Sequence, residues 1–240
     1  MFELELEGPA ARLRLDRPEA RNAIPLAGWD SLSERFGEVE TSGARLLVVE
    51  GAGGAFCAGA DLGDFEALRE DEAARTRFRT AMRRALDRLA ALPVPTIALI
   101  QGPCYGAGVA LALACELRLV GPAARFAITP ARMGISYPQE DVARLVALVG
   151  AGQASRLLFT GSAIDAEEAV RIGLAEARLD DAEALVDAVL ACDRASLEIL
   201  KRGIRLAAAG VASDEGQDAA FDALFGSDVL AERLAARARR

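Results

Sequence analysis

The sequence predicts an α/β core followed by a helical C-terminal region. Short apolar runs alternate with amphipathic helical patterns through the first half of the chain, which is the order expected of an α/β fold. From about Gln139 onward the pattern is helical only. The chain has 240 residues, which suits one large domain with an appendage. We therefore expect a core at 1–185 and a helical region at 186–240.

The expected strands lie in the first half of the chain. Apolar and polar residues alternate on both sides of Gly8-Pro9, which predicts a hairpin over residues 1–15. Continuous apolar runs indicate strands that are buried on both faces. Buried or short strands are expected at 46–49, 96–100, 117–120 and 126–128.

Helical patterns connect and follow these strands. A helix is expected to begin near Pro25, because proline is preorganised for the first helical turn. The charged stretch at 64–92 predicts one helix, with Phe78 and Met82 on its apolar face. Further helices are expected from about 108 to 115 and, toward the end of the chain, at 181–192, 194–209, 214–225 and 227–239.

The composition excludes several classes of function. There is no histidine, so catalytic triads and histidine-ligated metals are absent, and we expect no metal site. The context of the only lysine, Lys201, is not a phosphate-binding loop. A net charge of -8 disfavours binding to nucleic acid or to an anionic membrane. The cysteines have no C-x-x-C spacing, and no leader peptide or membrane-length apolar run is evident, so we expect buried thiols and a cytoplasmic location.

Two loops rich in glycine and alanine are the candidate functional segments. They lie at 53–62 and 101–111, each directly after an apolar strand. Small residues leave backbone N–H groups accessible, and one N–H from each loop could form an oxyanion hole. Each loop taken alone also fits a tight strand-to-helix connection. Gly106-Ala107-Gly108 imitates part of a dinucleotide-binding motif, but Leu111 stands where that motif needs its third glycine.

In several segments taken in the same order, the chain resembles the crotonase, or enoyl-CoA hydratase/isomerase, superfamily. The resemblance extends from about residue 10 to about residue 180. The matching segments are 16–24, 55–62, 95–98 with 102–108, 114–118, 159–162, 166–169 and 172–174. The resemblance implies a crotonase-like spiral of ββα units with a helical C-terminal region, through which members assemble as homotrimers or hexamers.

The resemblance also implies a substrate and a set of site residues. The substrate would be an acyl-CoA thioester, with coenzyme A as part of the substrate and no separate cofactor. The N–H groups of Ala58 and Ala107 would form the oxyanion hole and stabilise an enolate. Arg21 would meet a phosphate of coenzyme A. The other residues expected to bind substrate are Glu19, Ala23, Ala60, Asp61, Leu62, Gly106 and Pro130.

The chain departs from the hydratase pattern at the catalytic positions. Ala110 and Pro130 stand where hydratases of the superfamily have two glutamates, and neither residue can transfer a proton. We therefore expect no efficient hydratase. Some isomerases place one carboxylate at the position of Pro138 here, so Glu140 or Asp141, two and three residues later, could shuttle a proton as a neutral acid. Both acids also fit the first turn of a helix, where the dipole favours negative charge.

Tyr137 supplies a second hypothesis. Its surroundings resemble bacterial methylmalonyl-CoA decarboxylase, in which a tyrosine orients the substrate carboxylate, although that relative has histidine where this chain has Ala60. The tyrosine could equally pack over a pocket rim with its hydroxyl bonded to the backbone. Three functions stay open: an isomerase or atypical lyase that forms an enolate, a malonyl-CoA-type decarboxylase using Tyr137, and a non-catalytic acyl-CoA-binding protein.

Overall fold

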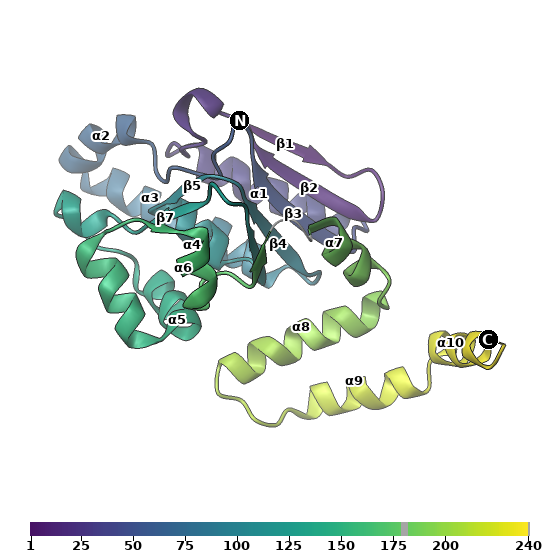
Figure 1. Ribbon diagram of the computed structural model, residues 1–240. Helices are drawn as coiled ribbons and strands as arrows, with labels where there is room; N and C mark the ends of the chain where they lie inside the picture. Colours follow the sequence, from purple (N-terminus) through teal and green to yellow (C-terminus); the bar gives the residue numbers. More distant parts are fainter. Residues whose placement is uncertain (179–181, 240) are drawn as a thin grey trace.

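A six-stranded sheet runs through the molecule (Figure 1). The computed structural model describes residues 1–178 and 182–239. The strand order is β1-β2-β3-β4-β6-β9, in which β1 and β2 form the predicted antiparallel hairpin and the remaining pairs are parallel. The strands are β1 (Phe2–Glu5), β2 (Ala10–Leu15), β3 (Leu46–Gly51), β4 (Thr96–Ile100), β6 (Leu117–Val120) and β9 (Ala177–Arg178). These strands confirm the predicted α/β class.

A second sheet of three strands lies beside the first. Its strand β5 pairs with β7 in parallel, and β7 pairs with β8 in antiparallel fashion. The strands are β5 (Pro103–Tyr105), β7 (Arg125–Ala127) and β8 (Ile164–Asp165). β5 lies inside the second glycine-rich loop, so this loop is held by a strand ladder on one side.

The described part of the chain forms ten α-helices, of which α9 and α10 lie apart from the sheets (Figure 1). The helices of the first part are α1 (Gly28–Thr41), α2 (Phe65–Glu70), α3 (Glu72–Ala91), α4 (Ala107–Leu113), α5 (Gln139–Thr160) and α6 (Ala166–Arg171). The later helices are α7 (Ala182–Leu190), α8 (Arg194–Ala208), α9 (Glu215–Phe225) and α10 (Asp228–Ala238). Short 3-10 turns lie at η1 (Pro18–Ala20), η2 (Leu62–Asp64) and η3 (Pro130–Met133).

The alternating side chains of the parallel strands separate two apolar layers. On β3, Leu47 and Val49 belong to the main core, which also contains Trp29 of α1 and the apolar side chains of α3 and α4. Leu46 of the same strand faces the other way, where Val186 of α7 covers it. The central strands β3 and β4 are therefore buried on both faces, which explains why they are continuous apolar runs.

Two expectations about the elements are wrong. The chain after Gln139 is not helical only, because β8 and β9 add short strands to the two sheets. The predicted helix at 64–92 is divided at Asp71, whose backbone is extended and whose carboxylate caps α3 by accepting from the N–H of Ala73. This cap ends one helix and begins the next, an arrangement that the apolar pattern alone does not reveal.

α5 alone among the described helices is long and apolar enough, by length and composition, to cross a membrane. This differs from the expectation that no apolar segment approaches that length. Gly150, with φ 74° and ψ 161°, interrupts the helical backbone in its middle. In its first turn Asp141 is fully buried and paired with Arg83 and Arg144, so this end of the helix packs against protein.

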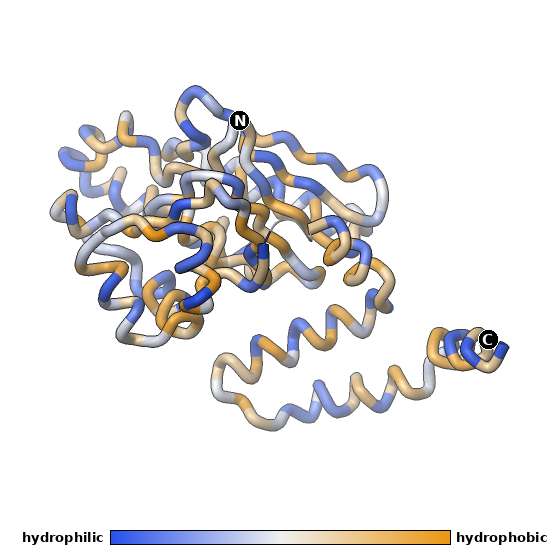
Figure 2. The backbone as a smooth tube through the Cα atoms, viewed as in Figure 1, coloured by the Kyte–Doolittle hydropathy of each residue, from blue (hydrophilic) through white to orange (hydrophobic). Residues whose placement is uncertain are grey.

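The C-terminal helices α8, α9 and α10 extend away from the body of the molecule (Figure 1). α7 packs on the sheet, so the predicted boundary between residues 185 and 186 falls inside a helix of the core, and the extension begins at α8. The predicted helix at 181–192 begins at a residue outside the described ranges. Apolar residues recur along the extension (Figure 2), and Cys192 at its start is exposed, whereas the other three cysteines are buried as expected.

Lys201 joins the extension to the core. Its Nζ lies 2.9 Å from Oε2 of Glu116 and donates to the carbonyl of Val94 at 2.8 Å. The same Oε2 accepts from the N–H and the hydroxyl of Thr96. Burial lowers the pKa of Lys201, and Glu116 opposes this by favouring the charged ammonium. One carboxylate oxygen therefore connects the strand β4 to the helix α8.

Replacing this carboxylate is expected to destabilise the protein. In the Glu116→Gln variant the buried ammonium loses its anionic partner, which costs about 2 kcal/mol of unfolding free energy. Urea denaturation measures this difference. Glu167→Gln, at an exposed position of α6, is the matched control and should change stability by less than about 0.5 kcal/mol. Equal stability of both variants and the parent would show that Lys201 does not depend on Glu116.

Candidate active site

The two glycine-rich loops meet through their backbones. Cys57 and Cys104 form an isolated parallel bridge, and the N–H of Tyr105 donates to the carbonyl of Cys57 at 2.9 Å. A Cβ at Gly108 would lie 2.3 Å from that same carbonyl oxygen, so only glycine allows this approach. A Cβ at Gly59, which has φ 106°, would lie 2.8 Å from the carbonyl oxygen of Tyr105 in the second loop. The pairing of the loops that the sequence suggested is therefore a contact between main chains.

Two backbone N–H groups at this contact have no acceptor within 1–178 and 182–239. One belongs to Ala107, the first residue of α4, where no helical carbonyl is available. The other belongs to Ala60, which forms a parallel bridge with Ile24. The bridge uses the N–H groups of Ile24 and Asp61, so the N–H of Ala60 points away from Ile24. Both alanines line the same cavity.

The sequence-based choice of Ala58 as an oxyanion-hole donor is wrong. Its N–H donates to the carbonyl of Arg21 at 2.9 Å and is not available to a ligand. The left-handed backbone of Gly59 changes the direction of the chain between Ala58 and Ala60. The available donors are therefore Ala60 and Ala107.

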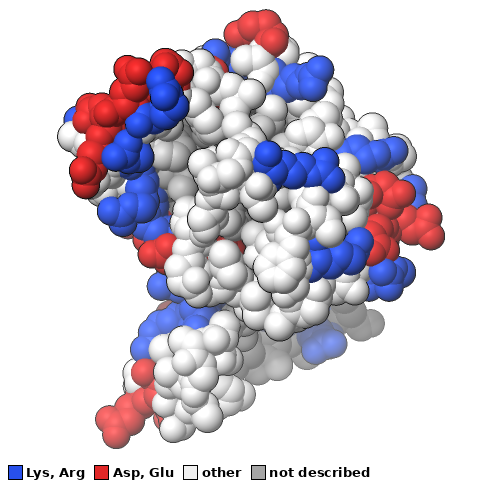
Figure 3. Space-filling view, turned by 90° about the vertical axis from the view of Figure 1, so that its left-hand side faces the viewer, with Lys and Arg blue, Asp and Glu red and all other residues white. Residues whose placement is uncertain are grey.

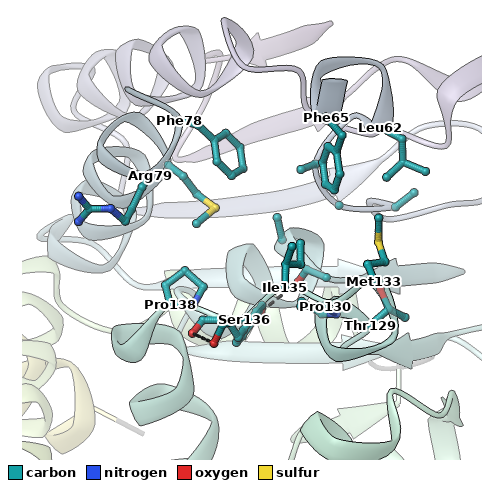
Figure 4. Close-up of a pocket in the computed structure, with 17 residues that line it drawn as sticks. Leu62, Phe65, Phe78, Arg79, Thr129, Pro130, Met133, Ile135, Ser136 and Pro138 are labelled. Atoms are coloured by element: carbon teal, nitrogen blue, oxygen red, sulfur yellow. Dashed lines mark hydrogen bonds between the residues drawn. The ribbon is translucent and has the colours of Figure 1, made fainter. Parts of the chain in front are cut away.

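The cavity beside these N–H groups has a volume of about 360 Å³. Residues of η3 and of the segment that follows it form one side, and Leu62, Phe65 and Phe78 from the first loop, α2 and α3 face them from the other side (Figure 4). Leu62 and Met133 lie at one end, and Phe78, Arg79 and Pro138 lie at the other (Figure 4). Figure 3 shows that the side of the molecule carrying α2 and α5 has an uncharged centre with charged side chains at its margins.

No carboxylate is among the described residues that line this cavity. Ala110 is fully buried in α4, and Pro130 and Pro138 line the wall as apolar side chains. Glu140 is exposed and lines an adjoining cavity instead. The two acids proposed as proton shuttles are thus absent from the wall, and both lie in the first turn of α5, as the alternative interpretation expected.

Asp141 is 0% exposed and is held by two arginines. Its Oδ1 accepts from Arg83 at 3.0 Å and from Arg144 at 3.4 Å, while Oδ2 has no hydrogen-bond partner among the described residues. Burial raises the pKa of Asp141, and the two arginines oppose this rise. The side chain fastens α5 to α3.

Tyr137 lines the cavity, and its hydroxyl donates to the carbonyl of Gly106 at 3.0 Å. Burial raises the pKa of Tyr137 well above its usual value, so the hydroxyl stays protonated at neutral pH. The phenol has one proton, and the bond to Gly106 uses it. This geometry agrees with the alternative interpretation of Tyr137 as a tyrosine bonded to the backbone.

The residues expected to bind substrate divide into two groups. Those that line the cavity are Ala60, Leu62, Gly106 and Pro130. Those outside it are Glu19, Arg21, Ala23 and Asp61, which belong to a network centred on Arg17 or to the exposed surface. Asp61 pairs with Arg17 at 2.9 Å. The N–H of Gly63 lowers the pKa of Asp61 most, and Arg17 lowers it further.

Asn22 is a positioning residue that the sequence analysis missed. It is buried at φ 60°, and its amide donates to the carbonyls of Ala52 and Ala55 at 2.9 and 2.8 Å. These bonds hold the start of the first loop. Asparagine tolerates the left-handed conformation better than most residues, and this preference was the sequence signal that could have identified Asn22.

Nothing else in the described ranges suggests nucleophilic or metal chemistry at this site. Cys57, inside the first loop, is fully buried, and burial raises its pKa to about 12, so the reactive thiolate is disfavoured. No group of three or more acidic or cysteine side chains within 1–178 and 182–239 could hold a metal ion. The chemistry available at the cavity is therefore that of its backbone donors.

A Cβ at Gly59 is expected to disturb the contact between the loops. In Gly59→Ala the new carbon would lie 2.8 Å from the carbonyl oxygen of Tyr105 and 3.3 Å from the nitrogen of Ala107. Because this clash adds to the strain of a left-handed backbone, we expect the variant to lose roughly 2–3 kcal/mol of unfolding free energy, measured by denaturant titration. Gly54→Ala is the matched control, since Gly54 also has a positive φ but open space around it, and it should cost only about 1 kcal/mol. Equal costs would contradict the close approach.

Comparisons with known proteins point to one family. The profile of the family described as enoyl-CoA hydratase/isomerase matches residues 6–212. The short-chain-enoyl-CoA hydratase of Clostridium acetobutylicum is 34% identical over 182 residues, which cover 75% of this chain and 69% of that protein. A Mycobacterium tuberculosis protein assigned as an enoyl-CoA hydratase is 32% identical over 227 residues, covering 94% and 90%.

A solved structure supports the fold as well as the family. A protein from Hyphomonas neptunium, assigned to the enoyl-CoA hydratase/isomerase family, superposes with a TM-score of 0.93 at 32% identity, over 99% of this chain and 94% of the other. The crotonase-like fold expected from the resemblance is thereby confirmed. This chain belongs to the enoyl-CoA hydratase/isomerase family.

Proposed function

We propose that this protein binds an acyl-CoA thioester in the cavity and polarises the thioester carbonyl with the N–H groups of Ala60 and Ala107. One observation carries the proposal: two unpaired N–H groups lie on the wall of an apolar cavity that contains no carboxylate among the described residues. Two such donors stabilise the negative charge that develops on the thioester oxygen when an enolate forms. The chain's own contribution is therefore electrostatic.

The position of Leu62 supports one orientation of this substrate. Leu62 is exposed at one end of the cavity and belongs to the segment expected to bind coenzyme A. The coenzyme A arm would enter past Leu62, and the acyl chain would extend toward Phe78 at the other end. No separate cofactor enters this proposal, because coenzyme A is part of the substrate.

The reaction we propose is that of an isomerase or an atypical lyase rather than a hydratase. No carboxylate is among the described residues that line the cavity, so in an isomerase the proton removed beside the thioester carbonyl would pass to solvent water and return from it. Hydration needs carboxylates that position and activate water, and Ala110 and Pro130 supply none. Loss of carbon dioxide from a malonyl-type thioester needs no protein base, which favours it as the second candidate. For Tyr137 to orient the departing carboxylate, its hydroxyl must exchange the bond to Gly106 for one to substrate.

One incubation distinguishes these reactions. The protein is mixed in deuterium oxide with crotonyl-CoA, a 3-enoyl-CoA, methylmalonyl-CoA and acetyl-CoA, and the products are read by mass spectrometry. We expect no water addition to crotonyl-CoA. We also expect at least one of three changes: conversion of the 3-enoyl-CoA, loss of carbon dioxide from methylmalonyl-CoA, or deuterium exchange next to the carbonyl. Normal hydration of crotonyl-CoA would refute the proposed reaction. If none of the four thioesters is converted but thioester binding is measurable, the non-catalytic acyl-CoA-binding alternative would be the one that stands.

Ala107→Pro tests the donor itself. Proline fits the first position of a helix and removes the N–H, so the variant keeps α4 while losing one donor. Turnover of the active thioester is expected to fall roughly a hundredfold. Ala166→Pro, at the first position of α6 and outside the cavity, is the matched control and should keep its activity. Full activity in Ala107→Pro would exclude this N–H from the mechanism.

We further propose that the helical extension assembles the chain into a homotrimer or a hexamer. Phe221 and Phe225 of α9 are 59% and 65% exposed, with ring centroids 4.9 Å apart, and Leu200 and Ile204 of α8 are also exposed. Apolar groups of this size on an extended element favour burial against another surface. Light scattering of the purified protein is expected to give three or six times the mass of the chain, and a monomer at micromolar concentration would contradict this.

A further inference from the structure

Arg79 of α3 is the one charged residue among the described residues that line the cavity. The rest of the wall is hydrocarbon, backbone and the hydroxyls of three side chains, Thr129, Ser136 and Tyr137. Arg79 is exposed, and its guanidinium extends outward at the end of the cavity (Figure 4). A group of the ligand that reaches this end could therefore meet it.

Arg79 is also the exception among the arginines of α3. Within the described ranges it forms no hydrogen bond or ion pair. The other five arginines of the helix all have partners. The pairs are Arg75 with the carbonyls of Leu68 and Arg69, Arg77 with Asp71, Arg83 with Asp87 and Asp141, Arg84 with Asp30, and Arg88 with Glu40.

The acids that line an adjoining cavity together with Arg79 already have arginine neighbours. Arg79 also lines the adjoining cavity of about 300 Å³, which contains Asp87 and Glu140. Asp87 is bound by Arg83 and by Arg144, each at 3.0 Å, and Glu140 lies 4.0 Å from Arg83. The guanidinium of Arg79 therefore keeps an uncompensated positive charge where the two cavities adjoin.

Arg79 lies at the end of the cavity opposite Leu62 (Figure 4). In the orientation proposed above, coenzyme A enters at Leu62, so its phosphates lie on the other side of the cavity from Arg79. The group that reaches Arg79 is then the far end of the acyl chain. A guanidinium binds a carboxylate through two parallel hydrogen bonds and selects it over an apolar terminus.

We propose that Arg79 is a specificity-determining residue and that the preferred substrates are acyl-CoA thioesters whose acyl chain ends in a carboxylate. This inference rests on the proposed binding of an acyl-CoA thioester. The apolar middle of the chain lies along Phe78 and Met82, and the terminal carboxylate pairs with the guanidinium of Arg79. The assignment concerns the far end of the acyl group and leaves the reaction at the thioester unchanged.

Paired ligands of equal chain length test the proposal. Calorimetry gives the Kd of succinyl-, glutaryl- and adipyl-CoA against butanoyl-, pentanoyl- and hexanoyl-CoA, with free coenzyme A as the reference. At one or more lengths the carboxylated thioester is expected to bind about three to ten times more tightly, as fits a charge-assisted pair at an exposed arginine. Arg79→Gln should remove this preference without changing the Kd of the uncarboxylated partner.

Two further variants separate a specific role from a general charge effect. Arg77→Gln removes an exposed arginine of the same helix that does not line the cavity, and it should keep the full preference. Arg79→Lys keeps the positive charge but not the planar guanidinium that binds a carboxylate through two hydrogen bonds, so it should retain part of the preference.

The outcomes that overturn the inference are distinct. If Arg79→Gln weakens free coenzyme A and all thioesters equally, Arg79 binds a phosphate of coenzyme A instead of the acyl end. If the parent protein binds both members of each pair equally, the inference fails while the proposed thioester binding stands. If no thioester binds at all, the proposed function fails and the inference fails with it.

Discussion

The close approach of two backbone segments is the constraint on which the site depends. The ends of the apolar strands β3 and β4 lead into loops whose main chains touch between Cys57 and Cys104, and glycines at 59 and 108 leave no Cβ in the way. Because the two loops are bonded to each other, the free N–H groups of Ala60 and Ala107 are held on one wall. Side-chain identity matters little for this geometry, so it survives where the catalytic side chains differ.

Much of the fold could be predicted from the sequence because continuous apolar runs and helical periodicity are strong signals. The hairpin, β3, β4 and the late helices follow from them. β8 and β9 have two residues each, too few for any periodic pattern. The donor position was missed for a different reason: Ala58 and Ala60 are chemically identical, and only the left-handed turn at Gly59 determines which N–H is free. Whether Glu140 lines the site cavity likewise depends on where α5 begins, and in the structure it does not line it.

The charges near the cavity follow one rule, which is that arginines satisfy nearly every acid. Asp141 is buried against Arg83 and Arg144, and Asp61 is bound by Arg17. Acids that the sequence suggested for proton transfer or substrate binding therefore form ion pairs that hold helices and loops together. Ala110 and Pro130 carry no carboxylate, and the nearby acids are paired with arginines. The polar groups of the described cavity wall are therefore backbone N–H donors, the hydroxyls of three side chains and one guanidinium.

The attachment of α8 by the only lysine of the chain has a chemical consequence. Lys201 is 4% exposed and bound to Glu116, so in the folded protein its amine is shielded from acylating reagents. Lifting α8 from the core would uncover Lys201. Each molecule that acquires an acyl label on Lys201 under native conditions has therefore passed through a state in which the extension is detached, and the rate of that labelling measures how often such openings occur.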